Sequence, residues 1–296
     1  MPSAKFTDEF IDGRPGFGLR PSWTGGSMTA NRVHVLSCGA MSCDLTWLLL
    51  KPGRTLRART ERERPAEWYP CTTHCVLVET PEGTLLWDTS CPRDWQTRWA
   101  PTGLQEFFPY DQVSDEEYLD ARLGQIGVEP QDIDYLVLSH LHFDHAGNIG
   151  MFAGTGARLV CNDKEKEFAF GFEGAFNGAH LKADYAAWDF DTVSGDTEIL
   201  PGVTLIEAPG HTPGTMAMKV DLPETGTMLF TSDAVYMGDS YGPPAVPAAV
   251  VNDLSAWYAS VEKIRGIAER SDATVVFGHD AEQLRSMRLA PNGFYV

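Results

Sequence analysis

Three histidines and an aspartate fall within six residues of the segment SHLHFDHAGN: His140, His142, Asp144 and His145. The apolar run YLVL directly before them predicts a buried strand. In extended backbone, residues two apart point to the same side, so His140, His142 and Asp144 can converge, and His145 joins them if the chain then turns into a helix. Imidazole and carboxylate groups are ligands that zinc prefers. The segment therefore predicts a metal site.

Three further residues complete a candidate two-metal centre. His211 lies in the turn sequence APGHTPGTMA, Asp233 follows the strand-like run MLFTS, and His279 follows TVVFG. Each is predicted just beyond the C-terminal end of a strand, where sites in mixed α/β proteins are often built. With the first four residues they supply five histidines and two aspartates, enough to hold two ions with one bridging carboxylate.

The elements that position these residues are short strands and a few helices. Apolar residues at helical spacing predict a helix over 254–269 and a shorter one over 164–170. Ser114 and the acidic residues after it predict a capped helix that ends at Gly127. Strands are predicted at residues 33–38, 45–50, 75–79, 84–87, 135–138, 158–161, 203–208, 215–220, 228–231 and 274–277. Two strand-rich halves, each closed by helices, fit a sandwich of sheets with helices outside.

The bulk properties exclude several classes of protein. No apolar run in the 296 residues approaches the roughly 18 to 20 that span a bilayer. A formal net charge of −18 repels phosphate backbones, which argues against nucleic acid as a partner. The charged stretch over 54–65 is expected to be a solvated loop. Residues 1–27 lack periodicity and are expected to be an irregular N-terminal arm or leader, with a single domain over 28–296.

Six cysteines are scattered through a chain that shows no secretory leader, so we expect reduced thiols and a cytoplasmic protein. Two of them flank a histidine in CTTHC at residues 71–75. Without a second pair at zinc-finger spacing, they are expected to be ordinary, partly buried thiols.

The order His-x-His-x-Asp-His, then His in a GHTPG turn, then Asp, then a last His resembles the binuclear metallo-β-lactamase superfamily, from about residue 31 to the C-terminus. The resemblance implies an α/β (α+β) fold, a four-layer αβ/βα sandwich, and two divalent ions, expected to be Zn²⁺. The superfamily's pattern assigns His140, His142 and His211 to one ion, Asp144, His145 and His279 to the other, and Asp233 to both.

Two residues differ from those of particular branches of the superfamily and argue against membership of those branches. His142 stands where the di-iron redox branch has Glu, and Asp233 stands where some zinc β-lactamases have a Cys ligand. Asp88 in LLWDTS resembles the superfamily's aspartate that orients the metal-bearing loop. Ser90 occupies a position where glycine is usual, so a differently shaped turn is expected there.

Tyr236 points to a reaction. It follows Asp233 by three residues in SDAVY, the offset at which N-acyl homoserine lactone lactonases carry a catalytic tyrosine, and SHLHFDHAGN is also close to their motif. The resemblance implies opening of the lactone ring by a metal-bridging hydroxide. Tyr236 would stabilise the oxyanion, and Asp233 or Asp144 would pass a proton to the leaving alkoxide. The implied partner is a small-molecule lactone, with no membrane partner, and a homodimer is expected from the habit of the family.

Other reactions of the same fold remain as alternatives. A thioester hydrolase of the glyoxalase II type uses the same seven ligands but adds a basic helical region, whereas this chain ends soon after His279. Another lactonase or a phosphodiesterase would share the metals, although the charge of −18 disfavours a nuclease. Zinc that only stabilised the fold would not require a bridging aspartate with open coordination.

The aromatic-rich segments 95–110 and 170–190 are expected either to line an apolar pocket for an acyl chain or to make core or dimer contacts. His180, within the second segment, is expected at a loop or pocket rim rather than as an eighth ligand. His34 and His74 have no partners at ligand spacing and are expected to be structural.

Overall fold

The computed structural model describes residues 31–171 and 179–296. The predicted arm of residues 1–27 and the central part of the aromatic segment 170–190 lie outside the described residues. The division into an arm and a single domain therefore stays a prediction. Within the described ranges, no helix is both long enough and apolar enough to cross a membrane.

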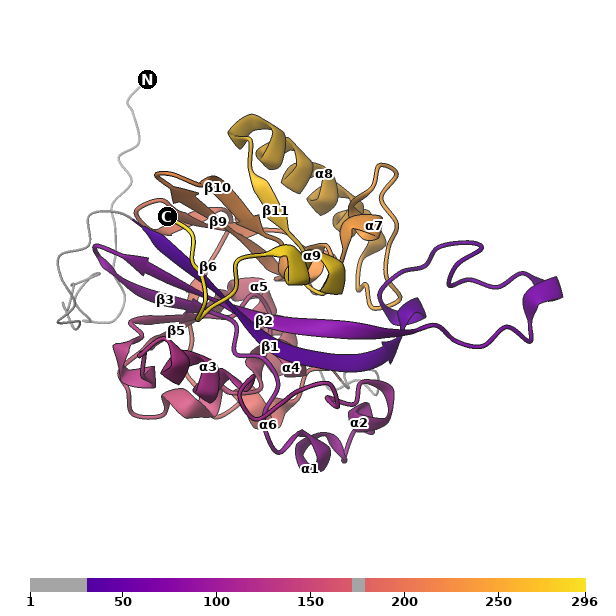
Figure 1. Ribbon diagram of the computed structural model, residues 1–296, viewed down its shortest axis with the longest axis horizontal. Coiled ribbons are helices and arrows are strands. Elements are labelled where there is room, and N and C mark those ends of the chain that lie inside the picture. The colour runs from indigo at the N-terminus through magenta and orange to yellow at the C-terminus, as the bar shows by residue number, and fades with distance from the viewer. Residues whose placement is uncertain (1–30, 172–178) are drawn as a thin grey trace, which may run out of the picture.

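Two β-sheets form the centre of the molecule (Figure 1). The first has the order β1-β2-β3-β4-β5-β6 and the second the order β11-β10-β9-β8-β7. The strands of the first sheet are β1 (Arg32–Asp44), β2 (Trp68–Thr80), β3 (Gly83–Trp87), β4 (Tyr135–Val137), β5 (Arg158–Asn162) and β6 (Asp191–Val193). Those of the second are β7 (Thr197–Leu200), β8 (Val203–Glu207), β9 (Met216–Leu222), β10 (Gly226–Phe230) and β11 (Thr274–Val276).

The helices cover the outer faces of the two sheets. The long helix α8 lies over the second sheet, and α3 lies on the opposite side of the molecule, against the first (Figure 1). The helices are α1 (Trp95–Trp99), α2 (Leu104–Phe107), α3 (Leu119–Gln125), α4 (Phe143–Ala146), α5 (Asp163–Gly171), α6 (Lys182–Tyr185), α7 (Gly238–Tyr241), α8 (Leu254–Ser271) and α9 (Ala281–Ser286).

Three hydrophobic layers hold this arrangement together. One lies between the sheets, where residues such as Val76 and Val78 meet Met218 and Phe230. A second joins the first sheet to α3 and α5, and a third joins the second sheet to α8. Side chains alternate along each strand, so Val76 and Val78 face the other sheet while Leu77, between them, faces the helices. The predicted four-layer αβ/βα sandwich is confirmed.

The topology brings the candidate ligands to one edge. Strands β8 and β10 both run antiparallel to β9, and β11 is parallel to β10, so the C-terminal ends of β8, β10 and β11 share an edge. The backbone N–H of Met216 donates to the carbonyl of Ser139 at 2.9 Å, which joins the end of β4 to this edge of the second sheet. His140, His211, Asp233 and His279 follow these strand ends, as the sequence predicts.

One predicted strand is wrong. Residues 45–50 form a 3₁₀ turn over Leu45–Trp47 followed by irregular chain, whereas β1 runs unbroken through Asp44. The Asp44 carboxylate accepts from the backbone N–H of Thr46 at 3.0 Å and caps the turn. Leu45 and Leu49 are buried against a separate cluster around Trp99 rather than in a sheet.

Of two other predictions, the helix after Ser114 starts later than expected, and the charged stretch 54–65 is exposed as expected. The helix expected after Ser114 begins only at Leu119, because Ser114 and Glu117 bond to each other in a separate turn. The charged stretch 54–65 is mostly exposed, as predicted. It belongs to the segment between β1 and β2, which projects from the body of the molecule (Figure 1).

Candidate metal centre

The end of β4 places the first four candidate ligands. His142 has extended backbone, with φ −75° and ψ 159°, and α4 begins at the next residue. The chain therefore changes from strand-like to helical conformation where the sequence predicts it. Asp144 and His145, in the first turn of α4, join the side of the chain that His140 faces, and all four side chains are buried.

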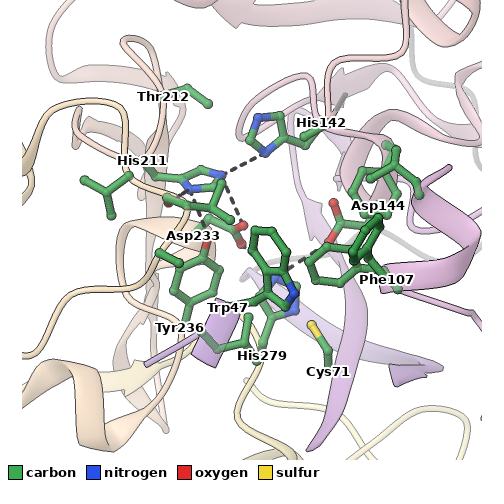
Figure 2. A pocket seen from close by; sticks show the side chains of 18 of the residues that line it. Trp47, Cys71, Phe107, His142, Asp144, His211, Thr212, Asp233, Tyr236 and His279 are labelled. Atoms are coloured by element: carbon green, nitrogen blue, oxygen red, sulfur yellow. Dashed lines mark hydrogen bonds and ion pairs between the residues drawn. The ribbon is translucent and has the colours of Figure 1, made fainter. Parts of the chain in front are cut away.

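Four residues form a first group whose ligand atoms lie within 4.8 Å of one another: His140, His142, His211 and Asp233. Nε2 of His211 is 3.1 Å from Nε2 of His140 and 2.9 Å from Nδ1 of His142. Figure 2 shows His142, His211 and Asp233 turned toward one another. His140 and His211 are far apart in the sequence, and the packing of the two sheets brings their side chains together.

Asp144, His145 and His279 form the second group. Asp233 lies between the two groups. Its Oδ1 is 3.2 Å from Nε2 of His145 and 3.0 Å from Nε2 of His279, while its Oδ2 is 3.3 Å from Nε2 of His211. One carboxylate thus offers one oxygen to each group, which is the geometry that a bridging ligand requires.

The chemistry of this donor set fits two cations. Nε2 of His145 and Oδ1 of Asp233 are buried and make no hydrogen bond within the described part of the chain. Burial lowers the pKa values of His140 and His142 well below the ordinary value, so both rings are neutral, and each has a nitrogen within 3.1 Å of Nε2 of His211. A divalent cation among these atoms would satisfy all of them.

Bonds on the far side of three of the imidazoles aim their other nitrogen at the centre. Nδ1 of His145 is 2.8 Å from Oδ2 of Asp88, and Nδ1 of His279 is 2.8 Å from the carbonyl oxygen of Thr72. Nδ1 of His211 is 2.9 Å from the carbonyl oxygen of Val250. Since a carbonyl or carboxylate oxygen only accepts, each of these Nδ1 atoms donates a proton, and each Nε2 faces the centre as the atom that can bind a metal.

Asp88 also anchors the loop that carries the ligands. Its Oδ1 accepts from the backbone N–H of Ser139 at 2.7 Å, and its Oδ2 accepts from the Ser139 hydroxyl at 2.8 Å. Ser90, two residues on, has φ 56°, the left-handed conformation that glycine adopts most readily. Serine therefore retains at this position a backbone shape that suits glycine, and its hydroxyl bonds that of Thr73 at 2.8 Å.

The two aspartates of the centre differ in proton affinity. Burial alone would raise the pKa of Asp233, but the charges of His279, His145 and His211 outweigh it and hold that pKa well below the ordinary value. Burial raises the pKa of Asp144, and the nearby Asp233 adds to the effect. In the metal-free centre, Asp233 therefore stays ionised to lower pH than Asp144 does.

Tyr236 lies against the first group. Its hydroxyl oxygen is 2.9 Å from Nδ1 of His211, and its ring stacks on His279 with centroids 5.4 Å apart. Figure 2 shows Tyr236 beside Asp233. Burial, followed by the charges of Asp233 and Asp144, raises the pKa of Tyr236 well above its ordinary value. The hydroxyl therefore stays protonated and can act as a donor.

The two groups lie in the wall of a cavity of about 540 Å³ whose remaining lining is mainly apolar. From segment 95–110, Leu104, Phe107 and Phe108 line the cavity, whereas Trp99 and Tyr110 are core residues. That segment therefore contributes both to the lining of the cavity and to the core. Trp47, from the segment wrongly predicted as a strand, also lines the cavity; its aromatic ring carried no sequence signal that could have assigned it there.

Of the remaining histidines, His180 and His74 lie near the centre and His34 lies on the first sheet. His180 lines the cavity, as predicted, but is buried and bonds Glu165, a residue that the sequence did not single out. His34 pairs with Glu79 on the first sheet, in keeping with a structural role. His74 lies beside the second group, and loss of solvent, with the charges of His279 and His145, lowers its pKa to about 3.

All six cysteines are free, buried thiols, as the expectation of reduced thiols requires, but Cys71 and Cys75 are fully buried rather than partly buried as expected. Cys38 and Cys75 lie with their sulfur atoms 3.9 Å apart, and Cys71 lines the cavity. Neither cysteine of CTTHC belongs to a group of converging ligand atoms within the described residues.

A two-sheet sandwich with clustered histidines and aspartates at one edge defines a class of metal-dependent proteins. The family model of the metallo-beta-lactamase superfamily matches residues 68–279. The chain belongs to this superfamily.

Within the superfamily, the chain is similar to N-acyl homoserine lactonases. It is 37% identical over 279 residues to the N-acyl homoserine lactonase AiiB of Agrobacterium fabrum, covering 90% of this chain and 99% of the relative. It is 30% identical over 270 residues to AiiA of Bacillus thuringiensis subsp. kurstaki, covering 89% and 99%. A solved N-acyl homoserine lactone hydrolase with N-hexanoyl-L-homoserine at its catalytic metal centre superposes with a TM-score of 0.71, at 27% identity, over 91% of this chain and 100% of that one.

Proposed function

We infer that this protein is a metal-dependent hydrolase that opens the lactone ring of N-acyl homoserine lactones. The observation that carries the inference is the position of Tyr236, whose hydroxyl lies beside His211, one of the converging ligands, in the wall of a mainly apolar cavity. The relatives named N-acyl homoserine lactonases support it. Such a substrate has a polar ring for the metal centre and an apolar acyl chain for the rest of the cavity.

We further propose the ligand assignment for two ions. His140, His142 and His211 would hold one, Asp144, His145 and His279 the other, and Asp233 would bridge them. Zn²⁺ is the proposed metal because imidazole nitrogen and carboxylate oxygen are its usual ligands. When bound, two such ions supply hydroxide near neutral pH and polarise the substrate carbonyl.

The chain's own residues would guide the proton and the charge. Tyr236 donates a hydrogen bond to the oxyanion that forms when the ring carbonyl is attacked. The carboxylate of Asp144, in the wall of the cavity, takes the proton from the attacking water. It passes that proton to the ring oxygen as the carbon–oxygen bond of the ring breaks. The product is the open-chain N-acyl homoserine.

Trp47, Phe107 and Phe108 are proposed to hold the acyl chain. The ring of Trp47 lies 6.0 Å from that of Phe107 and 5.5 Å from that of Phe108, centroid to centroid. These rings line the cavity together with Leu104 and Met41. Burial of each methylene of a chain among them would contribute about 0.8 kcal/mol.

A parallel assay tests the proposed function. The metal-loaded protein is given N-hexanoyl homoserine lactone, a glutathione thioester and a bis-aryl phosphodiester at equal concentrations. We expect rapid opening of the lactone and little turnover of the other two. Cleavage of the thioester with the lactone untouched would contradict the proposal and favour the glyoxalase II type of reaction. Metal analysis of protein purified without added metal tests the identity of the ions.

Three expectations about the protein's surroundings stay proposals. They are a cytoplasmic location, a homodimer, and the absence of nucleic-acid and membrane partners. Light scattering of the purified protein tests the dimer. Gel-shift and vesicle sedimentation assays at low salt test the other partners, since electrostatic binding is strongest there.

A further inference from the structure

Glu165 is a completely buried carboxylate that the proposed mechanism does not use. It lies in α5, and its side chain is 0% exposed. Its Oε1 accepts from the backbone N–H of Leu141 and from Nε2–H of His180, both at 2.9 Å. Its Oε2 accepts from the hydroxyl of Thr212 at 2.5 Å. Three donors from three separate segments thus meet on one side chain.

Each of these donors adjoins a proposed ligand. Leu141 stands between His140 and His142 in the chain, and Thr212 directly follows His211. The ring of His180 lies against the ring of His142, with centroids 4.3 Å apart and an interplanar angle of 75°. Glu165 therefore joins the two turns that carry the three-histidine half of the centre.

A second buried carboxylate contacts both halves of the centre. Asp88 accepts from the backbone and hydroxyl of Ser139 and from His145, a ligand of the second group. The Ser139 hydroxyl also lies 3.0 Å from Nδ1 of His140, in the three-histidine half. The donors to Glu165, in contrast, all adjoin the three-histidine half, so a disturbance of Glu165 should affect that half more than the other.

The electrostatics keep Glu165 in the form that this role requires. Burial alone would raise the pKa of Glu165, but hydrogen bonds from His180, Thr212 and Leu141 outweigh it and hold that pKa below the ordinary value. An ionised carboxylate only accepts hydrogen bonds, so it can take all three donors at once. A glutamine carries no negative charge, so it weakens every one of these bonds, and its N–H₂ group must either oppose Leu141 and His180 or reverse the bond to Thr212.

We propose that Glu165 and His180 are positioning residues for the three-histidine half of the centre. The Glu165 carboxylate sets the spacing between the turn of His142 and the turn of His211, and the His180 ring holds the plane of the His142 ring. Neither residue belongs to the two groups of converging metal ligands found in the described part of the chain. The inference rests on the proposed two-metal function and concerns how this chain prepares one of its two sites.

The test measures the affinity of each site for Co²⁺, whose absorption spectrum reports bound metal, by competition with a chelator. In Glu165→Gln we expect one of two equivalents to bind about 10- to 100-fold more weakly. The other equivalent should keep its parental affinity. The matched control is Glu167→Gln, an exposed residue of the same helix, which should leave both affinities unchanged.

Ligand deletions show which half has weakened. His211→Ala removes a ligand of the three-histidine half, so adding Glu165→Gln should have little further effect on the remaining equivalent. In a His279→Ala background, Glu165→Gln should weaken the equivalent that remains. Asp88→Asn should instead weaken the remaining equivalent in both backgrounds, because Asp88 contacts His145 directly and His140 through Ser139. Non-additivity of this kind distinguishes coupling to one site from general loss of stability.

Two further variants address the pair itself. Thr212→Val removes one donor to Glu165 while leaving the carboxylate in place, and should weaken the same equivalent to a smaller extent. It carries the test if Glu165→Gln does not fold. His180→Asn should broaden or shift the Co²⁺ spectrum of that equivalent, because the His142 ring loses its neighbour.

Unchanged affinity for both equivalents in Glu165→Gln and Thr212→Val would overturn the inference and leave the proposed function intact. Weakening of the equivalent that survives in His211→Ala would also overturn it. A parent protein that binds fewer than two equivalents would overturn both the inference and the proposed function.

Discussion

The hydroxyl oxygen of Tyr236 and Nδ1 of His211 lie 2.9 Å apart, and the same nitrogen lies 2.9 Å from the carbonyl oxygen of Val250. With Nε2 of His211 facing the other histidines, the proton of the ring is on Nδ1 and is shared between the two oxygens. The tyrosine oxygen is then an acceptor toward His211. Its own O–H bond can be donated to the neighbouring Asp233 or to a substrate in the cavity.

This relationship predicts the behaviour of Tyr236→Phe. Loss of an oxyanion donor typically lowers kcat by about 10² to 10³-fold, so we expect a fall of this order in lactone opening. Metal content should not change, because Nδ1 of His211 keeps its bond to Val250. Tyr241→Phe, in the half-buried α7, is the control and should retain full turnover. If Tyr236→Phe loses metal, the hydroxyl supports His211 rather than the substrate.

The charges of the centre predict a pH-dependent stability of the metal-free protein. Burial opposes protonation of His279, but Asp233 and Asp144 outweigh it and raise the pKa of His279 from 6.5 to about 9. A raised histidine pKa stabilises the folded state fully below about pH 6.5, and that stabilisation is lost as the pH rises through about 9. The Tm of metal-free protein should therefore fall between pH 7 and 9.5.

Metal loading should flatten this dependence, because a bound cation replaces the proton between His279 and Asp233. Binding should also release protons to the buffer, which calorimetry in buffers of different ionisation enthalpy can count. Parallel Tm curves with and without metal would contradict the proposed roles of these two residues.

Gly214, in the GHTPG turn, is predicted to be intolerant of a side chain. A Cβ at this position would lie 2.3 Å from the backbone nitrogen of Glu165. Gly214→Ala should therefore cost about 1 to 3 kcal/mol of unfolding free energy, as overpacking does, measured by urea denaturation. Gly124→Ala is the matched control, because nothing lies within 4 Å of its Cβ position in α3. It should be neutral or stabilising by about 0.5 to 1 kcal/mol.

Trp47 is predicted to discriminate among acyl chains. Trp47→Ala should raise KM roughly tenfold for a ten-carbon acyl chain, equivalent to about 1.4 kcal/mol, and change it little for a four-carbon chain. Trp68→Ala is the control, since Trp68 is an exposed tryptophan of β2 that does not line the cavity. An equal rise in KM for both chain lengths would show that Trp47 acts on the shape of the site rather than on the chain.

The local pattern of the chain was sufficient to predict the strand ends, the helix over 254–269 and the seven residues that converge. This is possible because spacing of two in a strand, and a turn into helix, already place His140, His142 and Asp144 on one side. The same reasoning failed at residues 45–50, where a run of leucines is equally compatible with a strand or a turn. Contact with the cluster around Trp99 determined the outcome there.

The packing of the fold determined which side chains form hydrogen bonds between segments that are distant in sequence. Nothing in the run DKEKEF distinguishes Glu165 from its acidic neighbour Glu167, yet one is buried among three donors and the other is exposed. The orientation of α5 about its own axis determines which glutamate is buried, and that orientation depends on the sheet against which α5 packs. The sequence alone thus supplied the ligands that would bind metal. The fold supplied the buried carboxylates, at Glu165 and Asp88, that hold those ligands in place, because a hydrogen bond between distant segments exists only once the sheets have packed.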